Sequence, residues 1–378
     1  MMKLLYLSSV RVPSNKASGL AIARQCEGFS ECGWEVDLHV PERSEEQQSI
    51  SEYYGMDVRF TFYSFASTSH LFKFGKFGFL ALALYENLRA ILFYLTHYTN
   101  YDVIYSREKL RILIFILMGL RSKCYVEIHQ VHEDFITKFV ARNVKKVVVI
   151  SNGLRDYYSE FAARDDISVE PSGVYLDQFR NVPSKNHLRE SLVLPNGAIV
   201  YGYIGKFTTI GKDKGVEDIV IAFSELYSVQ KDVFLYLVGV EEEERFYYQN
   251  VIDKLNLPNN VIKVVELDQS RFAEYVKVCD VLLMNYPDST HYAKYMSPIK
   301  LFAYLAAGKP IISTDLPTVR EVENMQSVLY TVPNNTKDYA EKMLQAYTEL
   351  PVLTKEAESN KELAKQFAWR ARGMRILN

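Results

Sequence analysis

The sequence has few cysteines and no excess of charge. Its four cysteines (Cys26, Cys32, Cys124 and Cys279) include no C-x-x-C pair, so neither a zinc site nor a disulfide framework is predicted. The formal net charge is −2 and the pI about 6.4, whereas a nucleic-acid-binding domain usually carries a basic surface. These absences argue against a zinc protein, a disulfide-rich scaffold and a nucleic-acid partner.

Long uncharged apolar runs are also missing. A membrane-spanning helix needs about 20 mostly apolar residues, and no uncharged run approaches that length. The apolar start, Met1–Leu7, reaches Arg11 and Pro13 too soon for a signal peptide, and no small-residue cleavage site follows. The sequence therefore predicts a soluble, cytoplasmic protein.

The chain contains enough apolar residues for two ordinary globular domains. It has 378 residues, 48% hydrophobic and 24% charged, and one core rarely grows beyond about 250–300 residues. Short apolar runs alternate with amphipathic stretches, a pattern typical of parallel sheets covered by helices. The predicted strands are Lys3–Ser9, Glu35–Val40, Val58–Tyr63, Asp102–Ser106, Lys123–Ile128, Lys146–Ile150, Ile199–Gly205, Val233–Gly239, Val261–Val265, Asp280–Met284 and Pro310–Ser313.

The predicted architecture is α/β, with two Rossmann-like domains facing a central cleft. A polar stretch with proline, 178–186, is predicted to be the linker. We therefore expect an acceptor-side domain over 1–180, a ligand-binding domain over 181–362 and a terminal segment over 363–378. In such folds ligands bind at the carboxyl ends of the strands.

Two loops in the second half have features of an anion site. In the first, Gly205 and Lys206 end a strand, and the run 211–215, which contains Lys212 and Lys214, opens a helix. Glycines let the backbone approach a ligand, and a helix N-terminus directs unpaired N–H groups at an anion. A pyrophosphate fits this pattern; a solvated lysine-rich turn is the alternative interpretation.

The second loop precedes another helix. Ser297 and Pro298 have the favoured order of an N-cap followed by proline at the first helical position, and Gly308 is placed to end that helix. A third loop, after Gly239, could accommodate the base of a nucleotide.

These motifs resemble a known family. The run S-P-I-K-L-F-A-Y-L-A-A-G-K-P-I-I (297–312), preceded by G-K…K-G, is similar to the C-terminal domain of the retaining, GT-B-fold glycosyltransferases of family 4, in its "S-P-x-K-L-F" subgroup. Weaker similarities occur at 170–179, at 33–36 and at 367–369, the start of a last helix that returns to the first domain in this fold. The resemblance thus covers nearly the whole chain, most strongly its second half.

The resemblance implies particular roles for particular residues. Lys206 and Lys214 match the basic pair that stabilises the donor diphosphate as it leaves, and His129 matches the histidine that faces the transferred sugar. Without the resemblance, a structural hydrogen bond would be the simpler interpretation of His129. The remaining donor-binding candidates are Gly19, Gly205, Lys212, Gly239, Met296, Ser297, Pro298, Ile299, Lys300 and Ala303.

Two further residues are acceptor-side candidates. His132 lies close to His129, and Arg107 follows the predicted strand 102–106. A surface salt bridge is the simpler interpretation of Arg107, and we prefer it at this stage.

The sequence departs from the family at one important place. The family pattern has two glutamates, the second of which contacts ribose, and the corresponding positions here are Tyr295 and Ala303. Since alanine cannot accept a hydrogen bond from a hydroxyl, either donor affinity comes from elsewhere or the donor is bound differently. Natural drift, an engineered inactivating change and lost catalysis all remain open.

The function predicted from these motifs is retaining transfer of a sugar, from a UDP- or GDP-sugar to a glycan or lipid-linked acceptor, in cell-surface polysaccharide synthesis. No metal or other cofactor is expected, since no D-x-D motif is present and lysines and helix ends can hold the phosphates. A sugar-nucleotide 2-epimerase of the same fold and a non-catalytic nucleotide-sugar-binding homologue are the alternatives.

A membrane partner is also suggested. Lysines and phenylalanines alternate over Phe72–Phe79, and basic and aromatic residues together suit a bilayer interface containing anionic lipid. The alternative, a loop and helix packed in the first domain's core, is slightly preferred. Peripheral attachment to the inner face of the cell membrane therefore stays a hypothesis.

Overall fold

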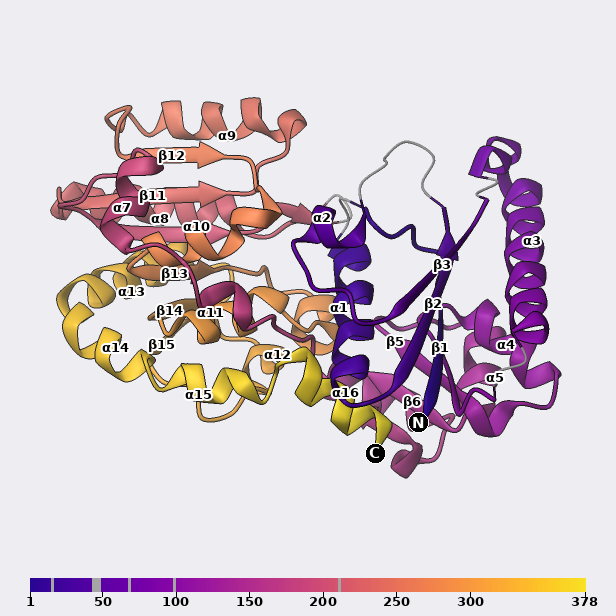
Figure 1. Ribbon diagram of the computed structural model, residues 1–378. Helices are drawn as coiled ribbons and strands as arrows, with labels where there is room; N and C mark the ends of the chain where they lie inside the picture. The colour runs from indigo at the N-terminus through magenta and orange to yellow at the C-terminus, as the bar shows by residue number, and fades with distance from the viewer. Residues whose placement is uncertain (15–16, 43–48, 67–68, 98–99, 210–211) are drawn as a thin grey trace. The chain divides into compact units, whose positions relative to one another are not determined.

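The computed structural model describes residues 1–14, 17–42, 49–66, 69–97, 100–209 and 212–378. The chain divides into two compact units, one formed by Met1–Gly173 with Ala368–Asn378 and the other by Val174–Phe367 (Figure 1). Each unit is a parallel α/β domain, as the alternating pattern predicted.

The units divide at residues that differ from the predicted 180/181 and 362/363. The Val174 N–H donates to the Phe367 carbonyl at 2.8 Å, which pairs the two crossing segments at the edge of the second unit. Phe179 and Val182 pack against the core of that unit. The stretch 178–186, predicted as a linker, is therefore part of the second unit.

The first unit contains a seven-stranded parallel sheet of order β3-β2-β1-β4-β5-β6-β7. The order reverses at β1 and β4, which is where ligands bind in doubly wound folds. The strands are β1 (Lys3–Leu7), β2 (Glu35–Pro41), β3 (Thr61–Phe65), β4 (Val103–Ser106), β5 (Cys124–Ile128), β6 (Lys146–Val149) and β7 (Ile167–Val169). The third strand begins later than predicted, and β7 was not predicted.

The C-terminal helix α16 (Trp369–Leu377) belongs to the first unit, as the resemblance implied. It packs along α1 (Ala17–Glu31), where the backbones approach so closely that a Cβ on Gly28 would lie 2.5 Å from the Trp369 carbonyl oxygen. The other helices of this unit are α2 (Ile50–Tyr54), α3 (Gly75–Thr96), α4 (Lys109–Leu117), α5 (Phe135–Asn143) and α6 (Asn152–Tyr158), with short 3-10 turns η1 (Ser69–Phe74), η2 (Arg121–Lys123) and η3 (Arg164–Asp166).

The second unit contains a six-stranded parallel sheet of order β12-β11-β8-β13-β14-β15, which reverses at β8 and β13. Its strands are β8 (Ile199–Ile204), β11 (Val233–Val238), β12 (Ile262–Val265), β13 (Val281–Met284), β14 (Ile311–Thr314) and β15 (Val328–Thr331), and a small hairpin is formed by β9 (Thr208–Thr209) and β10 (Lys212–Asp213). Strand β15 and the hairpin were not predicted.

Both faces of this second sheet are covered by helices. Tyr201 and Tyr203 of β8 point into one core cluster, and Val200 and Ile204 point into another, because successive side chains of a strand alternate between faces. The helices are α7 (Lys185–Ser191), α8 (Val216–Val229), α9 (Glu242–Lys254), α10 (Phe272–Val278), α11 (Ile299–Ala307), α12 (Pro317–Arg320), α13 (Thr336–Thr348), α14 (Leu350–Ala357) and α15 (Asn360–Lys365), with short turns η4 (Asp177–Phe179), η5 (Gln269–Arg271) and the π-helix η6 (His291–Tyr295). The apolar face of α8 is formed by residues at helical spacing, and all four are buried: Ile219, Ala222, Phe223 and Leu226.

One helix of the first unit keeps an exposed apolar face. By length and composition, α3 could cross a membrane, and it is the one helix in the described part of the chain that meets this test. Six exposed side chains recur along it at helical spacing: Phe77, Leu80, Leu84, Leu88, Leu92 and Leu95. We call these six residues the α3 face. The preferred alternative, that this region packs in the core, is wrong for these side chains.

Candidate functional site

The second unit carries an anion-binding geometry at the carboxyl end of β8. Gly205 follows β8 with φ +140°, and Gly239 follows β11 with φ +126°. The two backbones are so close that a Cβ on Gly239 would lie 2.3 Å from the Gly205 carbonyl oxygen. Glycine is therefore required at 239, and the loop after β8 is held against the loop after β11.

Lys300 reaches this loop from the first turn of α11. Its Nζ is buried and has no hydrogen-bond partner among the residues that the structure describes. It lies 3.5 Å from the centre of the Tyr203 ring, and a Cβ on Gly205 would be 3.7 Å from it. Burial, with a smaller contribution from the charge of Lys214, lowers the Lys300 pKa well below its ordinary value. An unpaired buried amine is costly, so this arrangement is suited to receiving an anion.

Two more lysines lie around the same loop. The Lys214 Nζ donates to the Lys206 carbonyl at 3.2 Å, and burial together with the Lys206 charge lowers the Lys214 pKa to about 8. The Lys206 ammonium is more exposed and pairs with Glu241. Since Lys214 precedes Gly215, the N-cap of α8, the lysines and a helix N-terminus occur together.

The start of α11 differs from the prediction. The helix begins at Ile299 with Pro298 as its N-cap, so Pro298 is not the first helical residue and Ser297 lies outside the helix. The Pro298 side chain does not cap this end, because proline has no side-chain oxygen. Met296 is buried and Ile299 is exposed. Gly308 ends the helix in the left-handed conformation, as predicted.

Ala303 is buried in the core of the second unit, with 4% of its surface exposed. It lies three residues after Lys300 on α11, on the same side of the helix. The helix therefore presents a lysine amine in its first turn and no carboxylate one turn later.

Two donor-binding candidates are placed differently or not described. Gly19 lies in the first turn of α1 rather than in a loop, and the space above it is filled by the chain itself, since a Cβ there would be 2.5 Å from Ser14 Oγ. The Lys212 backbone lies in β10, but its side chain, like Gly211, is outside the described residues.

The first unit contains a cavity of about 450 Å³, within the range of small-molecule sites. His129, Arg107 and His132, the acceptor-side and sugar-facing candidates, all line it. Apolar side chains of α3 and β5 form much of the remaining wall: Phe79, Leu82, Ala83, Val126 and Ile128. The cavity thus combines a polar end with an apolar side.

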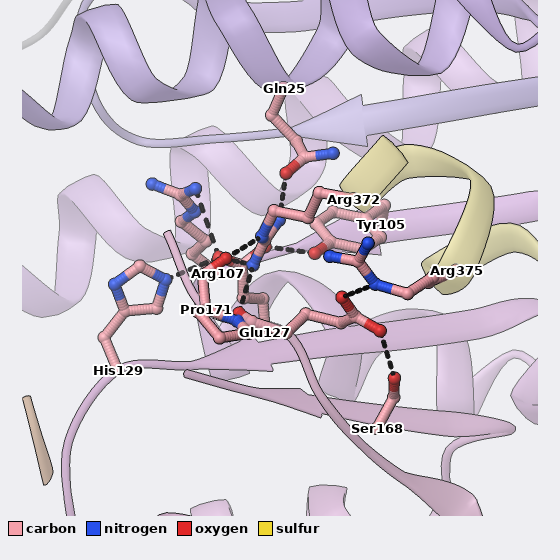
Figure 2. A network of polar contacts seen from close by, with 10 residues as sticks. Gln25, Tyr105, Arg107, Glu127, His129, Ser168, Pro171, Arg372 and Arg375 are labelled. Atoms are coloured by element: carbon pink, nitrogen blue, oxygen red, sulfur yellow. Dashed lines mark hydrogen bonds and ion pairs between the residues drawn. The ribbon is translucent and has the colours of Figure 1, made fainter. Parts of the chain in front are cut away.

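Glu127 is the centre of the polar end (Figure 2). This buried carboxylate accepts from Arg107 at 3.1 Å, from Arg372 at 3.0 Å and from His129 Nε2 at 2.5 Å, and also from the Tyr105 hydroxyl. Although burial alone would raise the Glu127 pKa, the charges of Arg107 and Arg372 hold it well below its ordinary value. Glu127 is therefore ionised at neutral pH.

His129 is neutral at physiological pH. About 39% of its side chain is exposed, yet desolvation and the Arg107 charge lower its pKa, against the opposing effect of Glu127. With Nε2 donating to Glu127, Nδ1 is the unprotonated nitrogen. Nδ1 has no partner within the described residues, so it can accept a hydrogen bond from a ligand hydroxyl in the cavity.

The structure corrects the preferred interpretation of Arg107. Its side chain is only 14% exposed, so the ion pair with Glu127 is buried and is not a surface salt bridge. Its Nε is buried without a partner among the described residues. His132 lies nearby, with its ring 3.3 Å from the Gln130 amide nitrogen, and desolvation lowers its pKa.

Sequence reasoning missed the residues that hold these candidates in place. Glu127 lies on β5 and His129 directly follows the end of that strand. Residues two apart in extended backbone face the same side, so alternation could have identified Glu127. Arg372 lies on α16, 245 residues from Glu127, and no local pattern marks it. No group of three or more His, Cys, Asp or Glu side chains able to hold a metal occurs in the described ranges.

The second unit matches a known protein family. Residues 184–367, nearly all of the second unit, match the family described as "Glycosyl transferases group 1". A putative teichuronic acid biosynthesis glycosyltransferase, TuaH of Bacillus subtilis, is 33% identical over 85 residues, which are 22% of this chain and 21% of TuaH. A lipopolysaccharide 1,2-N-acetylglucosaminetransferase of Salmonella typhimurium is 24% identical over 178 residues, 46% of this chain and 44% of that protein.

Among solved structures, Anabaena HepE in complex with UDP and glucose has a TM-score of 0.72 and 16% identity, covering 100% of this chain and 98% of HepE. Another crystal of HepE holds UDP-glucose. The chain therefore has the two-domain α/β fold of GT-B glycosyltransferases. Its second unit is a group 1 glycosyltransferase domain, although the curated relatives are matched over less than half of their length.

Proposed function

We propose that this protein is a retaining glycosyltransferase that moves a sugar from a nucleoside-diphosphate sugar to a glycan or lipid-linked acceptor in cell-surface polysaccharide synthesis. The observation that carries the proposal is the buried Nζ of Lys300, which has no hydrogen-bond partner in the described part of the chain and lies beside Gly205 in a group 1 glycosyltransferase domain. Because structures of HepE hold UDP and UDP-glucose, UDP is the first nucleotide to test.

The donor diphosphate is proposed to lie against the loop after β8. There Lys300 and Lys214 would pair with phosphate oxygens, and the N–H groups that open α8 would donate to them. These groups stabilise the charge that develops as the bond between the anomeric carbon and the diphosphate breaks. The acceptor hydroxyl oxygen bonds to the same carbon, and its proton passes to the departing diphosphate. This front-face course follows from the family resemblance.

The acceptor is proposed to enter the cavity of the first unit. His129 Nδ1 and Arg107 Nε both lack protein partners within the described residues, and both suit a sugar hydroxyl. The apolar wall from α3 suits the lipid part of an acceptor.

The experiment is thermal unfolding of the purified protein with UDP, GDP, ADP and CMP. A nucleotide at a hundredfold excess over its Kd stabilises the folded state by about 2.7 kcal/mol. We expect UDP to stabilise the native protein in this way and not to stabilise Lys214→Ala. The control is Lys254→Ala, which removes an exposed lysine at the end of α9 and should still be stabilised by UDP. No response to any nucleotide would overturn the proposed donor site.

Turnover assays distinguish sugar transfer from the two alternatives, isomerisation of the sugar nucleotide and binding without catalysis. We expect UDP to be released from UDP-glucose only when a glycan or lipid-linked acceptor is present. The product should retain the configuration of the anomeric carbon, as measured by NMR, and the reaction should proceed in the presence of EDTA. Isomerisation without an acceptor would indicate an epimerase. Binding without turnover, restored by Ala303→Glu, would indicate an inactive form.

Donor binding is expected to weaken above about pH 8. The free protein's Lys214 has a pKa of about 8 because of burial and the Lys206 charge, so it is charged below that pH and neutral above it. If the cation is required, UDP affinity falls about tenfold per pH unit above the Lys214 pKa. The measurement is the UDP Kd from pH 7 to 9.5 by calorimetry. Lys214→Arg, which stays charged throughout, should lack the break, and an unchanged break would contradict the assignment.

The α3 face is proposed to rest on a bilayer containing anionic lipid. Lys73, Lys76 and Arg89 are exposed beside it, and Glu86, the one acidic residue of α3, is buried and paired with Arg111. Basic charge next to an apolar face matches an anionic surface. Because Leu82 and Ala83 of the same helix line the cavity, attachment here would bring a lipid-linked acceptor next to its site.

A further inference from the structure

We propose that Arg372, on the C-terminal helix, is a positioning residue: it holds the Glu127 carboxylate that orients His129 in the cavity. The inference rests on the proposed function in one respect, that His129 contacts a substrate. The contacts themselves do not depend on it.

Arg372 is almost completely buried, with 1% of its side chain exposed. Its Nε donates to the Pro171 carbonyl at 2.8 Å, and its Nη2 donates to the Glu170 carbonyl at 3.2 Å and to Glu127 Oε1 at 3.0 Å. Its Nη1 donates to the Gln25 side chain. Every guanidinium nitrogen is therefore engaged, and the position of the planar fork is fixed.

Helix attachment alone does not explain this residue. Arg375 already pairs with Glu170 at 2.8 Å on the same helix, Ile376 is buried in the core, and Trp369 packs on Gly28. A buried ion pair is weak evidence for stability, since desolvation offsets its attraction. Arg372 instead extends past these contacts to the carboxylate of Glu127 (Figure 2), one of the residues that line the cavity.

Glu127 transmits the effect of Arg372 to His129. Oε1 accepts from Arg107, Arg372 and His129 together, so the position of this one oxygen determines where the imidazole lies. Because the carboxylate is ionised, Nε2 carries the proton and Nδ1 stays an acceptor. Without Arg372, Glu127 would keep Arg107 and Tyr105 but could shift between them.

The charge of Arg372 also changes the pKa of His129. Arg107 and Arg372 lower the His129 pKa, and Glu127 raises it. The other charged or titratable groups that line the cavity are Arg11, Glu86, Glu108, Lys109, Arg111 and His132, and they are unchanged by substitutions on α16. Loss of Arg372 should therefore raise the His129 pKa, and loss of the Glu127 charge should lower it.

The experiment compares Arg372→Met with Arg375→Met, which removes an ion pair of the same helix that does not touch Glu127. The His129 pKa is read from its ring-proton NMR signal, assigned by its absence in His129→Ala. We expect a rise in Arg372→Met, a fall in Glu127→Gln and no change in Arg375→Met. For sugar transfer we expect Arg372→Met to lower kcat about tenfold or more, to leave the KM for the donor unchanged and to move the acid limb of the pH profile upward.

If Arg372→Met does not fold, Arg372→Lys serves instead. Lysine keeps the positive charge but lacks the several N–H donors of the planar guanidinium, so kcat should fall while the His129 pKa changes less than expected for Arg372→Met. An unaltered His129 pKa and pH profile in a folded Arg372→Met would overturn the inference. If the pKa values shift as expected but His129→Ala transfers sugar normally, the network is correct and the proposed role of His129 is wrong.

Discussion

Lys300→Met is expected to make the free protein more stable and to weaken UDP binding about tenfold to a hundredfold. The buried Nζ makes no hydrogen bond to any described residue, and an unsatisfied buried polar group costs about 1–3 kcal/mol. Methionine has a similar length and packs well in an irregular apolar site, so it should remove this cost. A charge-assisted hydrogen bond to the diphosphate, of about 1.5–3 kcal/mol, is lost in the same substitution.

The gain in stability should depend on pH. Burial lowers the Lys300 pKa in the folded protein, whereas in the unfolded chain Lys300 has its ordinary pKa of 10.5. At a pH between these two values the unfolded chain therefore binds more protons than the folded one. Stability of the native protein therefore rises with pH in that range. The advantage of Lys300→Met is largest at low pH and shrinks toward about pH 10.5.

Chemical denaturation and UDP calorimetry measure the two effects on the same samples. Lys254→Met is the matched control, because that lysine is exposed on α9 and should change neither quantity. A Lys300→Met protein that is less stable, or that binds UDP as tightly as the native chain, would show that the amine has a structural role.

Most of the fold could be predicted because both sheets are parallel and their inner strands are buried on both faces. Such strands appear in the sequence as continuous apolar runs, as in Val233–Val238, which is buried throughout. The missed strands, Ile167–Val169 and Val328–Thr331, are edge strands and are only half-buried. Edge position alone does not explain these misses, because the edge strands β3 and β12 were predicted; Ile167–Val169 has only three residues, with a serine between the two apolar ones.

The two candidate sites differ in how far sequence reasoning could reach. Lys214 directly precedes Gly215, and Lys300 lies in the first turn of α11, two residues after Pro298, so glycine and proline mark both lysines by local signals. Whether Lys300 has a partner depends on what packs around it, which a sequence does not state. Arg107 was misjudged for the same reason: the choice between a surface and a buried ion pair depends on Glu127 and Arg372, which lie on other elements.

The structure extends the candidate membrane-contact region beyond the residues that the sequence indicated. Alternation of lysine and phenylalanine over Phe72–Phe79 suggested an interface loop, but the exposed apolar side chains continue along α3 to Leu95. Their spacing of three or four residues puts them on one face of a helix. Sequence alone could not distinguish this face from one packed in the core, since amphipathic helices of both kinds have the same period.

Changing four residues of the α3 face to serine (Phe77, Leu80, Leu84 and Leu88) is expected to weaken binding to anionic vesicles at least a hundredfold. Phe77 is 85% exposed and Leu84 63%, so these side chains have apolar surface to bury in lipid. Each buried leucine or phenylalanine contributes up to about 1.5–3 kcal/mol, and about 2.7 kcal/mol suffices for a hundredfold change. The measurement is co-sedimentation with phosphatidylserine–phosphatidylcholine vesicles.

The matched control changes four exposed apolar residues of the second unit to serine: Val229, Phe246, Val332 and Val352. It removes comparable exposed apolar surface and should bind vesicles like the native chain. Replacing Lys76 and Arg89 by alanine should weaken binding to anionic vesicles by about fivefold per residue and leave binding to neutral ones unchanged, since each basic group near the surface is worth about 1 kcal/mol. Equal binding by all these proteins, or no vesicle binding by the native chain, would mean that α3 does not contact the bilayer. A lipid-linked acceptor would then have to reach the cavity without the protein resting on the membrane through this helix.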